Sequence, residues 1–418
     1  MSQLSDDCFA FGGPLMTTAE ALRVLTERVS VQVDTEEVGL DAAVGRILGA
    51  PVVAGLNVPP HDNAAVDGYA FRHRDLDPAA ESRLAVVGRA AAGHPFEARL
   101  GAGQAVRIFT GAVMAAGADT VVMQEDVRLD GDAVLVPPGL KKGANRRAAG
   151  EDVAAGDTVL RAGQRLRAQE VGLAATVGRD RLSVYRPLQV AVFSTGDELR
   201  EPGAALPPGA IYDANRHLLK ALLAGLHCRV SDLGILADDA RLVTERLAEA
   251  AGKHDLLLTS GGVSTGEEDH VKAAVEATGS LHFWRLAIKP GRPLALGQVA
   301  GTAFVGLPGN PVAAMVCFLR FARPLVLKLA GAVDLEPFFF QVPADFEHSK
   351  KPDRREWLRA RLVADRDGGL KAQKFERQGS GIITSLVDAD GLVEIPEDVT
   401  HLAKGSLVDF LPFNEVTS

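Results

Sequence analysis

Acidic side chains follow three successive apolar runs of the sequence that we expect to be buried strands. Because the carboxyl ends of parallel strands meet at one edge of a sheet, we expect these carboxylates to lie close together. Like charges gathered at one crevice are unfavourable unless a cation neutralises them, and oxygen ligands favour a hard ion. The pattern therefore predicts a Mg²⁺ site held by Glu198, Asp238 and Asp269.

Each of these carboxylates also has a simpler explanation when taken alone. Asp238 or Asp239 could cap the helix that is expected to follow, and Glu198 could be a solvated turn residue. Their coincidence at three consecutive strand ends is what favours a site.

A glycine-rich loop, SGGVSTG at 260–266, follows the third of these strands. Glycines let the backbone approach a ligand closely, and free amide groups can hold a phosphate. The loop has neither the Gly-Lys-Ser/Thr ending of a Walker loop nor the Rossmann glycine spacing. We assign it to ligand binding through Ser260, Gly261, Gly262, Ser264 and Gly266.

A second loop at the same expected edge has the sequence LPGNP, in which Pro308 and Gly309 precede Asn310. Asn310 and the proline after it fit the N-cap and first turn of a helix. The loop is a further candidate for ligand binding, although plain capping explains it equally well.

Basic residues gather nearby in the segment RLAIKPGRP, which holds Arg285, Lys289 and Arg292. In an extended chain Arg285 and Lys289 would share one side, because they are four residues apart. Two prolines make the segment rigid and non-helical. These cations could form salt bridges with the carboxylates, or they could bind a substrate anion.

The elements that must position these groups change in character along the chain. Thr17 or Thr18 can cap a first helix, with Glu20 in its first turn, and a second short helix is expected at about 39–48. Short β-branched runs then alternate with Gly and Pro up to about residue 142, and helical character returns near 168–177. Apolar strands alternate with amphipathic helices over 188–331, which predicts a doubly wound parallel sheet covered on both faces.

The expected fold is therefore multidomain, α/β plus β. The last residues lose the helices and predict a small β barrel or sheet. The expected domains are a discontinuous elongated domain at 1–55 and 143–187, an inserted β domain at 56–142, an α/β domain at 188–331 and a C-terminal β-barrel domain at 332–418.

The composition of the 418-residue chain excludes several classes of protein. A net charge of −9 gives no general attraction for nucleic acid. The three cysteines form no C-x-x-C pair, which argues against a disulfide framework or a zinc site. The N-terminus lacks the features of a signal peptide, and the apolar stretch 311–333 contains three basic residues and predicts a buried helix rather than a membrane span. We expect a cytoplasmic enzyme.

Nine motifs occur in order over about residues 15–412: DNAAVDGYA, IFTGA, GADTVV, GANRRAAGEDV, STGDEL, IYDAN, TSGGVSTGEEDH, AIKPGRP and GLPGNPVA. Together they resemble the molybdopterin molybdenumtransferase family, which includes the bacterial MoeA proteins and the E domain of gephyrin. The resemblance implies the four domains above, with an α/β domain related to the molybdopterin adenylyltransferases. It also implies a homodimer whose active site takes groups from both subunits.

The implied reaction joins adenylyl-molybdopterin and molybdate to give molybdenum cofactor, AMP and water, with Mg²⁺. Candidate partners are the adenylyltransferase and factors of downstream molybdoenzymes, with neither nucleic acid nor membrane. Positions that match functional residues of the family, besides the three carboxylates, are Asp67, Thr110, Asp152, Arg285, Lys289, Arg359 and Ser380.

The chain departs from the common family pattern at several places. Ala65 and Val66 precede Asp67 where many relatives have Ser-Ala-Met, and the proline usual after the Thr-Gly-Ala segment is missing. Arginine at 285 and 292 keeps the charge but not the shape of a lysine. These differences leave open a specialised paralogue, for example one tuned for tungstate. Two other functions also stay open, an adenylyltransferase and a non-catalytic cofactor carrier.

Overall fold

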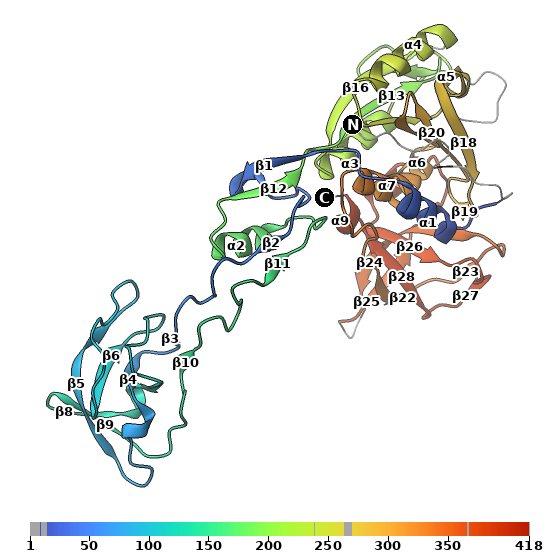
Figure 1. The fold of residues 1–418 in the computed structure, drawn as a ribbon. Helices are drawn as coiled ribbons and strands as arrows, with labels where there is room; N and C mark the ends of the chain where they lie inside the picture. The colour runs from blue at the N-terminus through green and yellow to red at the C-terminus, as the bar shows by residue number, and fades with distance from the viewer. Residues whose placement is uncertain (1–8, 10–14, 238, 263–269, 366–367, 418) are drawn as a thin grey trace.

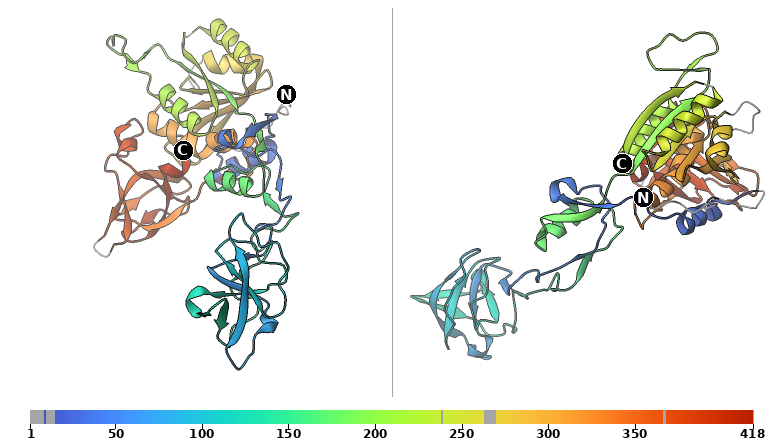
Figure 2. Two further views of the ribbon diagram at one scale, coloured as in Figure 1. Left: turned by 90° about the vertical axis from the view of Figure 1, so that its left-hand side faces the viewer. Right: turned by 45° about the horizontal axis from the view of Figure 1, so that its top comes forward.

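The computed structural model describes Phe9 and residues 15–237, 239–262, 270–365 and 368–417. The molecule is elongated (Figure 1). An α/β unit and a C-terminal β unit lie together at one end, and a small β unit lies at the other end of a narrow arm. Figure 2 shows the same arm from two further directions.

The distal β unit is a six-stranded sheet with the strand order β7-β4-β6-β5-β9-β8. Its strands are β4 (Gly68–Phe71), β5 (Ser82–Ala90), β6 (Gln104–Ile108), β7 (Thr120–Met123), β8 (Arg128–Asp130) and β9 (Ala133–Val136). Only β5 and β6 run parallel; the other neighbours are antiparallel. Phe71, Val106 and Ile108 are fully buried. The predicted β character of this region is confirmed.

The arm consists of strand pairs in which one partner precedes the distal unit and the other follows it. The pairs are β1 (Thr35–Gly39) with β12 (Arg181–Tyr185), β2 (Val52–Val53) with β11 (Thr158–Leu160), and β3 (Asn63–Ala64) with β10 (Arg146–Arg147). All three pairs are antiparallel, so the chain runs out along the arm and returns beside itself. Helix α2 (Ala168–Thr176) packs near the base, as predicted.

The predicted helix at 39–48 is wrong, because only a short 3-10 turn, η1 (Leu40–Ala42), forms there. Gly45 takes φ +80°, which ends helical geometry. Its N–H donates to the Leu166 carbonyl, and the Leu48 N–H donates to the Gln164 carbonyl. Hydrogen bonds to a distant segment thus replace the local helical ones.

The α/β unit contains a six-stranded sheet with the order β16-β13-β17-β21-β20-β18. Its strands are β13 (Gln189–Thr195), β16 (Arg229–Leu236), β17 (Leu256–Ser260), β18 (Gly279–Arg285), β20 (Pro293–Val299) and β21 (Thr302–Leu307). The pairs among β16, β13, β17 and β21 are parallel, whereas β20 and β18 are antiparallel additions. The sheet is therefore mixed rather than wholly parallel. The reason is the two-residue turn Ala300–Gly301, both at positive φ, because so short a connection can join only antiparallel strands.

Helices cover both faces of this sheet, as predicted. Alternate residues of β13 point to opposite sides: Val190 and Val192 belong to one apolar core, and Ala191 and Phe193 to another. The helices are α3 (Asn215–Gly225), α4 (Ala240–Ala251), α5 (His270–Thr278), α6 (Pro311–Cys317) and α7 (Arg323–Leu329), with the π-helical turn η4 (Phe318–Ala322) between the last two. Within the described ranges no helix is long and apolar enough to cross a membrane.

Helix α1 (Thr18–Arg28) begins at a capping box, in which Thr17 accepts from the N–H of Glu20 and the Glu20 carboxylate accepts from Thr17. Its apolar face contacts α7, and Leu25 is buried in the core shared with the α/β unit. The first helix of the chain therefore packs far from the arm that directly follows it.

The C-terminal unit is a sheet with the order β19-β24-β26-β28-β22, and β25 pairs with β24. Its strands are β19 (Ile288–Lys289), β22 (Phe340–Pro343), β24 (Arg355–Ala364), β25 (Leu370–Lys374), β26 (Gly391–Ile395) and β28 (Leu407–Pro412). The pair β23 (His348–Ser349) and β27 (His401–Leu402) and the short helices α8 (Thr384–Val387) and α9 (Phe413–Val416) complete it. One isolated bridge joins Ala344 to Ala372, next to β22 and β25. A closed barrel stays a prediction.

Strand β19 comes from the segment between β18 and β20 of the α/β unit, yet it pairs with β24. This parallel pairing joins the two units at the carboxyl-terminal edge of the α/β sheet. It also sets Lys289 opposite Glu356 in the register.

Candidate active site

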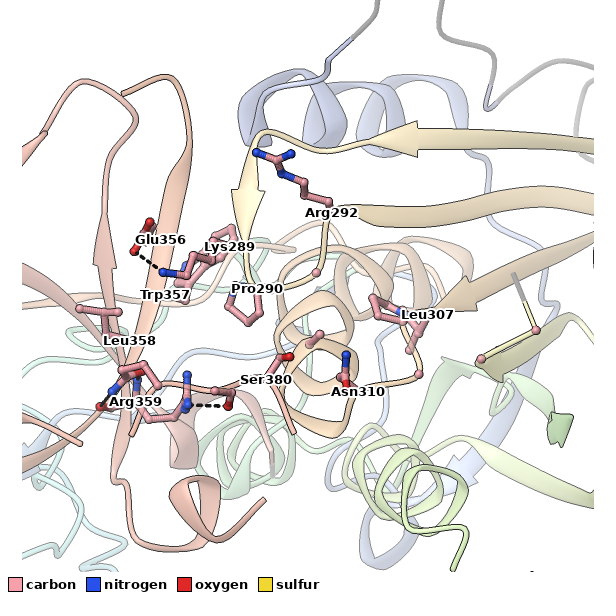
Figure 3. A pocket seen from close by; sticks show the side chains of 18 residues that line it. Lys289, Pro290, Arg292, Leu307, Asn310, Glu356, Trp357, Leu358, Arg359 and Ser380 are labelled. Atoms are coloured by element: carbon pink, nitrogen blue, oxygen red, sulfur yellow. Dashed lines mark hydrogen bonds and ion pairs between the residues drawn. The ribbon is translucent and has the colours of Figure 1, made fainter. Parts of the chain in front are cut away.

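A cavity of about 470 Å³ lies where the α/β unit meets the C-terminal unit (Figure 3). Five segments line it, and they come from both sides of the boundary. The lining residues are Gly261 and Gly262 after β17, Lys289–Arg292 after β19, Leu307–Asn310 after β21 with Ala313, Glu356–Arg359 in β24, and Gln378–Ser380. The cavity thus brings together eight of the predicted site residues: Gly261, Gly262, Lys289, Pro308, Gly309, Asn310, Arg359 and Ser380.

The floor of the cavity is formed by the ends of the neighbouring parallel strands β17 and β21. Gly261 and Gly262 follow β17 at φ +85° and +64°, and the Gly261 N–H donates to the Leu307 carbonyl. A Cβ on Gly262 would lie 2.2 Å from Oγ1 of Thr195. Only glycine fits this turn, so the backbone itself faces the cavity, as the loop composition predicted.

Asn215 ties three segments of this edge together. Its Nδ2 donates to Oγ of Ser260 and to the carbonyl of Gly309, both at 2.7 Å. Ser260 is buried and lies behind the lining rather than in it. Asn215 was not among the predicted site residues. It is the last residue of the IYDAN motif, and that motif is the signal that could have identified it.

Asn310 occupies the N-cap position of α6, but its side chain makes no capping hydrogen bond. It lines the cavity instead, as Figure 3 shows. Capping by the side chain therefore does not explain why an asparagine occupies position 310.

Lys289 is one of two cations on the C-terminal wall, and its side chain is 48% exposed. Its Nζ lies 3.5 Å from Oε2 of Glu356, which is fully buried. Burial alone would raise the pKa of Glu356, but a hydrogen bond with His348 and the charges of Lys289 and Arg354 outweigh it and hold the pKa below its ordinary value. Glu356 is therefore ionised at neutral pH.

Arg359 is the second cation, and it is 1% exposed. Its Nε donates to Oγ of Ser385 at 2.9 Å, and its Nη2 donates to the carbonyls of Arg377 and Gly379. No carboxylate of the described residues pairs with it. Burial lowers the pKa of Arg359 to about 10, so it stays charged at neutral pH. A buried charge without a counter-ion, in the wall of a cavity, suits an anionic ligand.

The basic segment 285–292 does not form one extended strand. Arg285 ends β18 and is exposed outside the cavity lining, while Leu286 to Ile288 are buried and Lys289 joins the other sheet. Arg292 lines the cavity in its place, and its carbonyl accepts from the Leu286 N–H. The sequence located the cationic segment but could not select which arginine lines the cavity.

Only one member of the predicted metal site can be placed. Glu198 is exposed after β13, where its carbonyl accepts from the Ile211 N–H, and no described cation forms an ion pair with it. Asp238 and Asp269, like Ser264 and Gly266, lie outside the described residues. Asp239 is the N-cap of α4 and accepts from the Leu242 N–H. The part of the chain that is described holds no group of three His, Cys, Asp or Glu residues suited to a metal.

Asp67 and Thr110 contact each other in the distal β unit, next to β4 and β6. Both the N–H and the Oγ1 of Thr110 donate to Oδ1 of Asp67 at 2.8 Å. The backbone hydrogen bond, followed by that of the hydroxyl, lowers the pKa of Asp67. Asp152 is exposed in the arm, where its N–H donates to the Val58 carbonyl. In Figure 1 this distal unit lies at the opposite end of the molecule from the α/β and C-terminal units, whose residues line the cavity.

Models of three protein regions match the chain. One described as the MoeA N-terminal region, domains I and II, matches residues 16–178; a probable molybdopterin binding domain matches 191–328; and the MoeA C-terminal region, domain IV, matches 341–413. The molybdopterin molybdenumtransferase of Haemophilus influenzae is 38% identical over 404 residues, which cover 96% of this chain and 100% of that protein. The chain belongs to the molybdopterin molybdenumtransferase family.

Other members of the family are similar to this chain over most of its length. The molybdopterin molybdenumtransferase 2 of Mycobacterium tuberculosis is 37% identical over 378 residues, which cover 88% of this chain and 93% of that protein. A crystal structure of the molybdopterin biosynthesis MoeA protein from Pyrococcus horikoshii is 32% identical, covers 96% of this chain and 99% of that one, and has a TM-score of 0.77. The family predicted from the nine motifs is confirmed, as is the molybdopterin-binding type of the α/β region.

Proposed function

We propose that this protein inserts molybdenum into molybdopterin, using adenylyl-molybdopterin and molybdate and releasing molybdenum cofactor, AMP and water. Family membership gives the reaction class, and one observation of the structure supports it most strongly. That observation is the cavity wall in which Arg359 is buried without a carboxylate partner, with Lys289 in the same wall. Molybdate is a tetrahedral dianion, so the uncompensated charge of Arg359, with the Lys289 ammonium in the same wall, would attract it.

The residues of the cavity would act mainly by binding and orienting. The Arg359 guanidinium is held by two carbonyls and a hydroxyl, which fix its orientation. Lys289 supplies a second positive charge in the same wall, on a side chain that is 48% exposed. The glycine turn at 261–262 lets backbone amides approach a phosphate of the substrate. No nucleophilic side chain is needed, because charge neutralisation and positioning account for the catalysis.

We also propose that Glu198, Asp238 and Asp269 hold Mg²⁺. The donor set fits this ion, since all three offer carboxylate oxygens, and Glu198 lies exposed at the expected sheet edge without an ion-pair partner among the described residues. When bound, Mg²⁺ would neutralise negative charge on the phosphoanhydride. The residues of this chain would keep the phosphates oriented toward the cavity.

A homodimer would explain why Asp67, Thr110 and Asp152 lie far from the cavity of their own chain. In a pair of elongated molecules, the distal unit of one subunit could lie against the cavity of the other. Under this proposal each active site takes its distal groups from one chain and its cavity from the partner. We place the protein in the cytoplasm, with the adenylyltransferase and downstream molybdoenzyme factors as its partners.

We further propose the four domains expected from the sequence, with boundaries near 55, 142, 187 and 331 and a C-terminal unit that closes into a barrel. The strand pairs of the arm support the discontinuous domain. The bridge between Ala344 and Ala372 supports closure of the barrel.

The test is to incubate purified protein with adenylyl-molybdopterin, Mg²⁺ and molybdate and to measure AMP. We expect AMP release that depends on molybdate. A protein that only carries the cofactor would bind it without releasing AMP, and an adenylyltransferase would make adenylyl-molybdopterin from molybdopterin and ATP. Either of these results would contradict the proposal.

A further inference from the structure

The buried carboxylate of Glu356 has no place in the mechanism above, yet it lies in the wall of the cavity beside Lys289. The pairing of β19 with β24 sets the two residues opposite each other. On its other sides, Oε2 of Glu356 lies 3.1 Å from Nε2 of His348, and Oε1 lies 2.5 Å from Nη2 of Arg354. A cluster of cations thus surrounds one buried negative charge.

The partners of Glu356 are unequal. The side chains of His348 and Arg354 are 15% and 19% exposed, whereas that of Lys289 is 48% exposed, and Lys289 lines the cavity. Glu356 therefore keeps two partly buried partners if Lys289 turns away to another anion. Lys289 has no second carboxylate partner among the described residues. In Figure 3 the dashed line marks their contact at the edge of the cavity.

The two cations of the C-terminal wall are consequently held in different ways. Arg359 is fixed by neutral hydrogen-bond acceptors and leaves its charge uncompensated. Lys289 is restrained by a full negative charge, which also lowers the positive potential of the cavity. A cavity lined by Lys289, Arg292 and Arg359 without that charge would attract any oxyanion present in a cell.

We propose that Glu356 is a positioning residue for molybdenum insertion, which holds the Lys289 ammonium at the cavity wall until the substrate anion takes it over. Its charge also keeps common oxyanions such as sulfate from occupying the site. This inference rests on the proposed function, because it takes molybdate as the anion that Lys289 receives. It predicts two separate effects of removing the charge, one on turnover and one on the binding of other anions.

The variant Glu356→Gln keeps the shape of the side chain and removes its charge. Without its anchor Lys289 is free to take many rotamers, so we expect kcat for molybdate-dependent AMP release to fall about tenfold. Because a negative charge next to the cavity is lost, sulfate should inhibit about tenfold more strongly. A purely structural role would reduce the fraction of folded protein and would not strengthen inhibition by sulfate.

Asp255→Asn is the matched control. Asp255 is also a buried, ion-paired carboxylate, but it accepts from Arg186 and lies at the amino-terminal end of β17, away from the cavity. We expect this variant to lower thermal stability and to leave both kcat and the inhibition constant of sulfate at their normal values. A second control is Glu356→Asp, which keeps the charge but shortens its reach, so turnover should fall while sulfate inhibition stays normal. It also serves as the test if Glu356→Gln does not fold.

A double-mutant cycle with Lys289→Met shows whether Glu356 acts through Lys289. In the Lys289→Met background, Glu356→Gln should cause no further loss of kcat, and a full additional loss would overturn the proposal. Sulfate binding measured by calorimetry needs no turnover, so it separates the two proposals. If the natural protein releases no AMP, the proposed function fails. If it releases AMP but Glu356→Gln changes neither kcat nor sulfate affinity, the role of Glu356 fails alone.

Discussion

The cavity and the Asp67–Thr110 pair are the two places where predicted site residues gather, and they are built differently. In the pair, a residue just before β4 and a residue just after β6 of one small sheet bond directly to each other, both bonds going to Oδ1 of Asp67. The cavity needs two sheets and five segments, and its cations are only partly neutralised. The two bonds from Thr110 orient the Asp67 carboxylate. The cavity wall carries positive charge that no carboxylate of the described residues fully neutralises, so it can bind an anion. The two regions therefore suit different roles in one reaction.

The largest effect should come from the cavity side of this comparison. Replacing Arg359 by Gln removes the buried charge that faces the anion, so we expect kcat/KM for molybdate to fall about 10²- to 10³-fold. Arg359→Lys should recover only part of the loss, because an ammonium cannot reproduce the fixed fork of the guanidinium. Molybdate-dependent AMP release measures both variants. A loss of less than threefold in Arg359→Gln would remove Arg359 from the site.

The second prediction tests whether the two regions work together across subunits. Asp67→Asn and Arg359→Gln should each inactivate both sites of a homodimer. Co-expression would form mixed dimers in which one of the two sites is intact, so the mixture should regain about one quarter of the normal activity. Inactive mixed dimers, purified through two different tags, would contradict a shared site.

The third prediction concerns the floor of the cavity. Gly262→Ala places a methyl group 2.2 Å from Oγ1 of Thr195 at a positive φ, and it should destabilise the protein by about 1–3 kcal/mol. Gly309→Ala is the matched control, because its Cβ would meet only the Cα of Gly261 at 3.8 Å. Thermal unfolding compares the two. Equal melting temperatures would show that the backbone turn at Gly262 is not tightly constrained.

The smallest effect is expected on the pKa of Asp67 when only the Thr110 hydroxyl is removed. The folded-state pKa of Asp67 is lowered from its ordinary value of 3.8, so the bonds from Thr110 stabilise the protein above pH 3.8. That stabilisation is lost as the pH falls through the folded-state pKa. In Thr110→Val, which keeps only the backbone bond, NMR titration should show a higher pKa for Asp67 than in the natural protein. An unchanged pKa would mean that the hydroxyl contributes nothing.

The sequence predicted the elements that follow local periodicity better than those that depend on distant partners. The apolar strand that became β13 and the capping box of α1 follow from neighbouring residues alone. The helix expected at 39–48 did not form, because Gly45 and Leu48 bond to a segment more than a hundred residues away. The antiparallel addition of β20 was missed because only the two-residue turn before β21 determines its direction.

The candidate site shows the same division. The glycine turn and Lys289 were identified from their composition and motif, and Arg292 was named only as a member of the same cationic segment, whereas Glu356 was not predicted at all. Glu356 reaches the cavity only because β19 leaves one sheet and pairs with β24 of the other. Arg292 replaces Arg285 because the chain turns between β18 and β20. Neither rearrangement has a signal in the spacing of the residues themselves.

The most direct test of the cavity as the anion site is to grow crystals with tungstate, a heavier tetrahedral dianion, and to measure its anomalous scattering. We predict a peak inside the cavity, within hydrogen-bonding distance of Arg359 and Lys289. A well-occupied tungstate elsewhere on the molecule, with this cavity empty at saturating concentration, would contradict the proposed site.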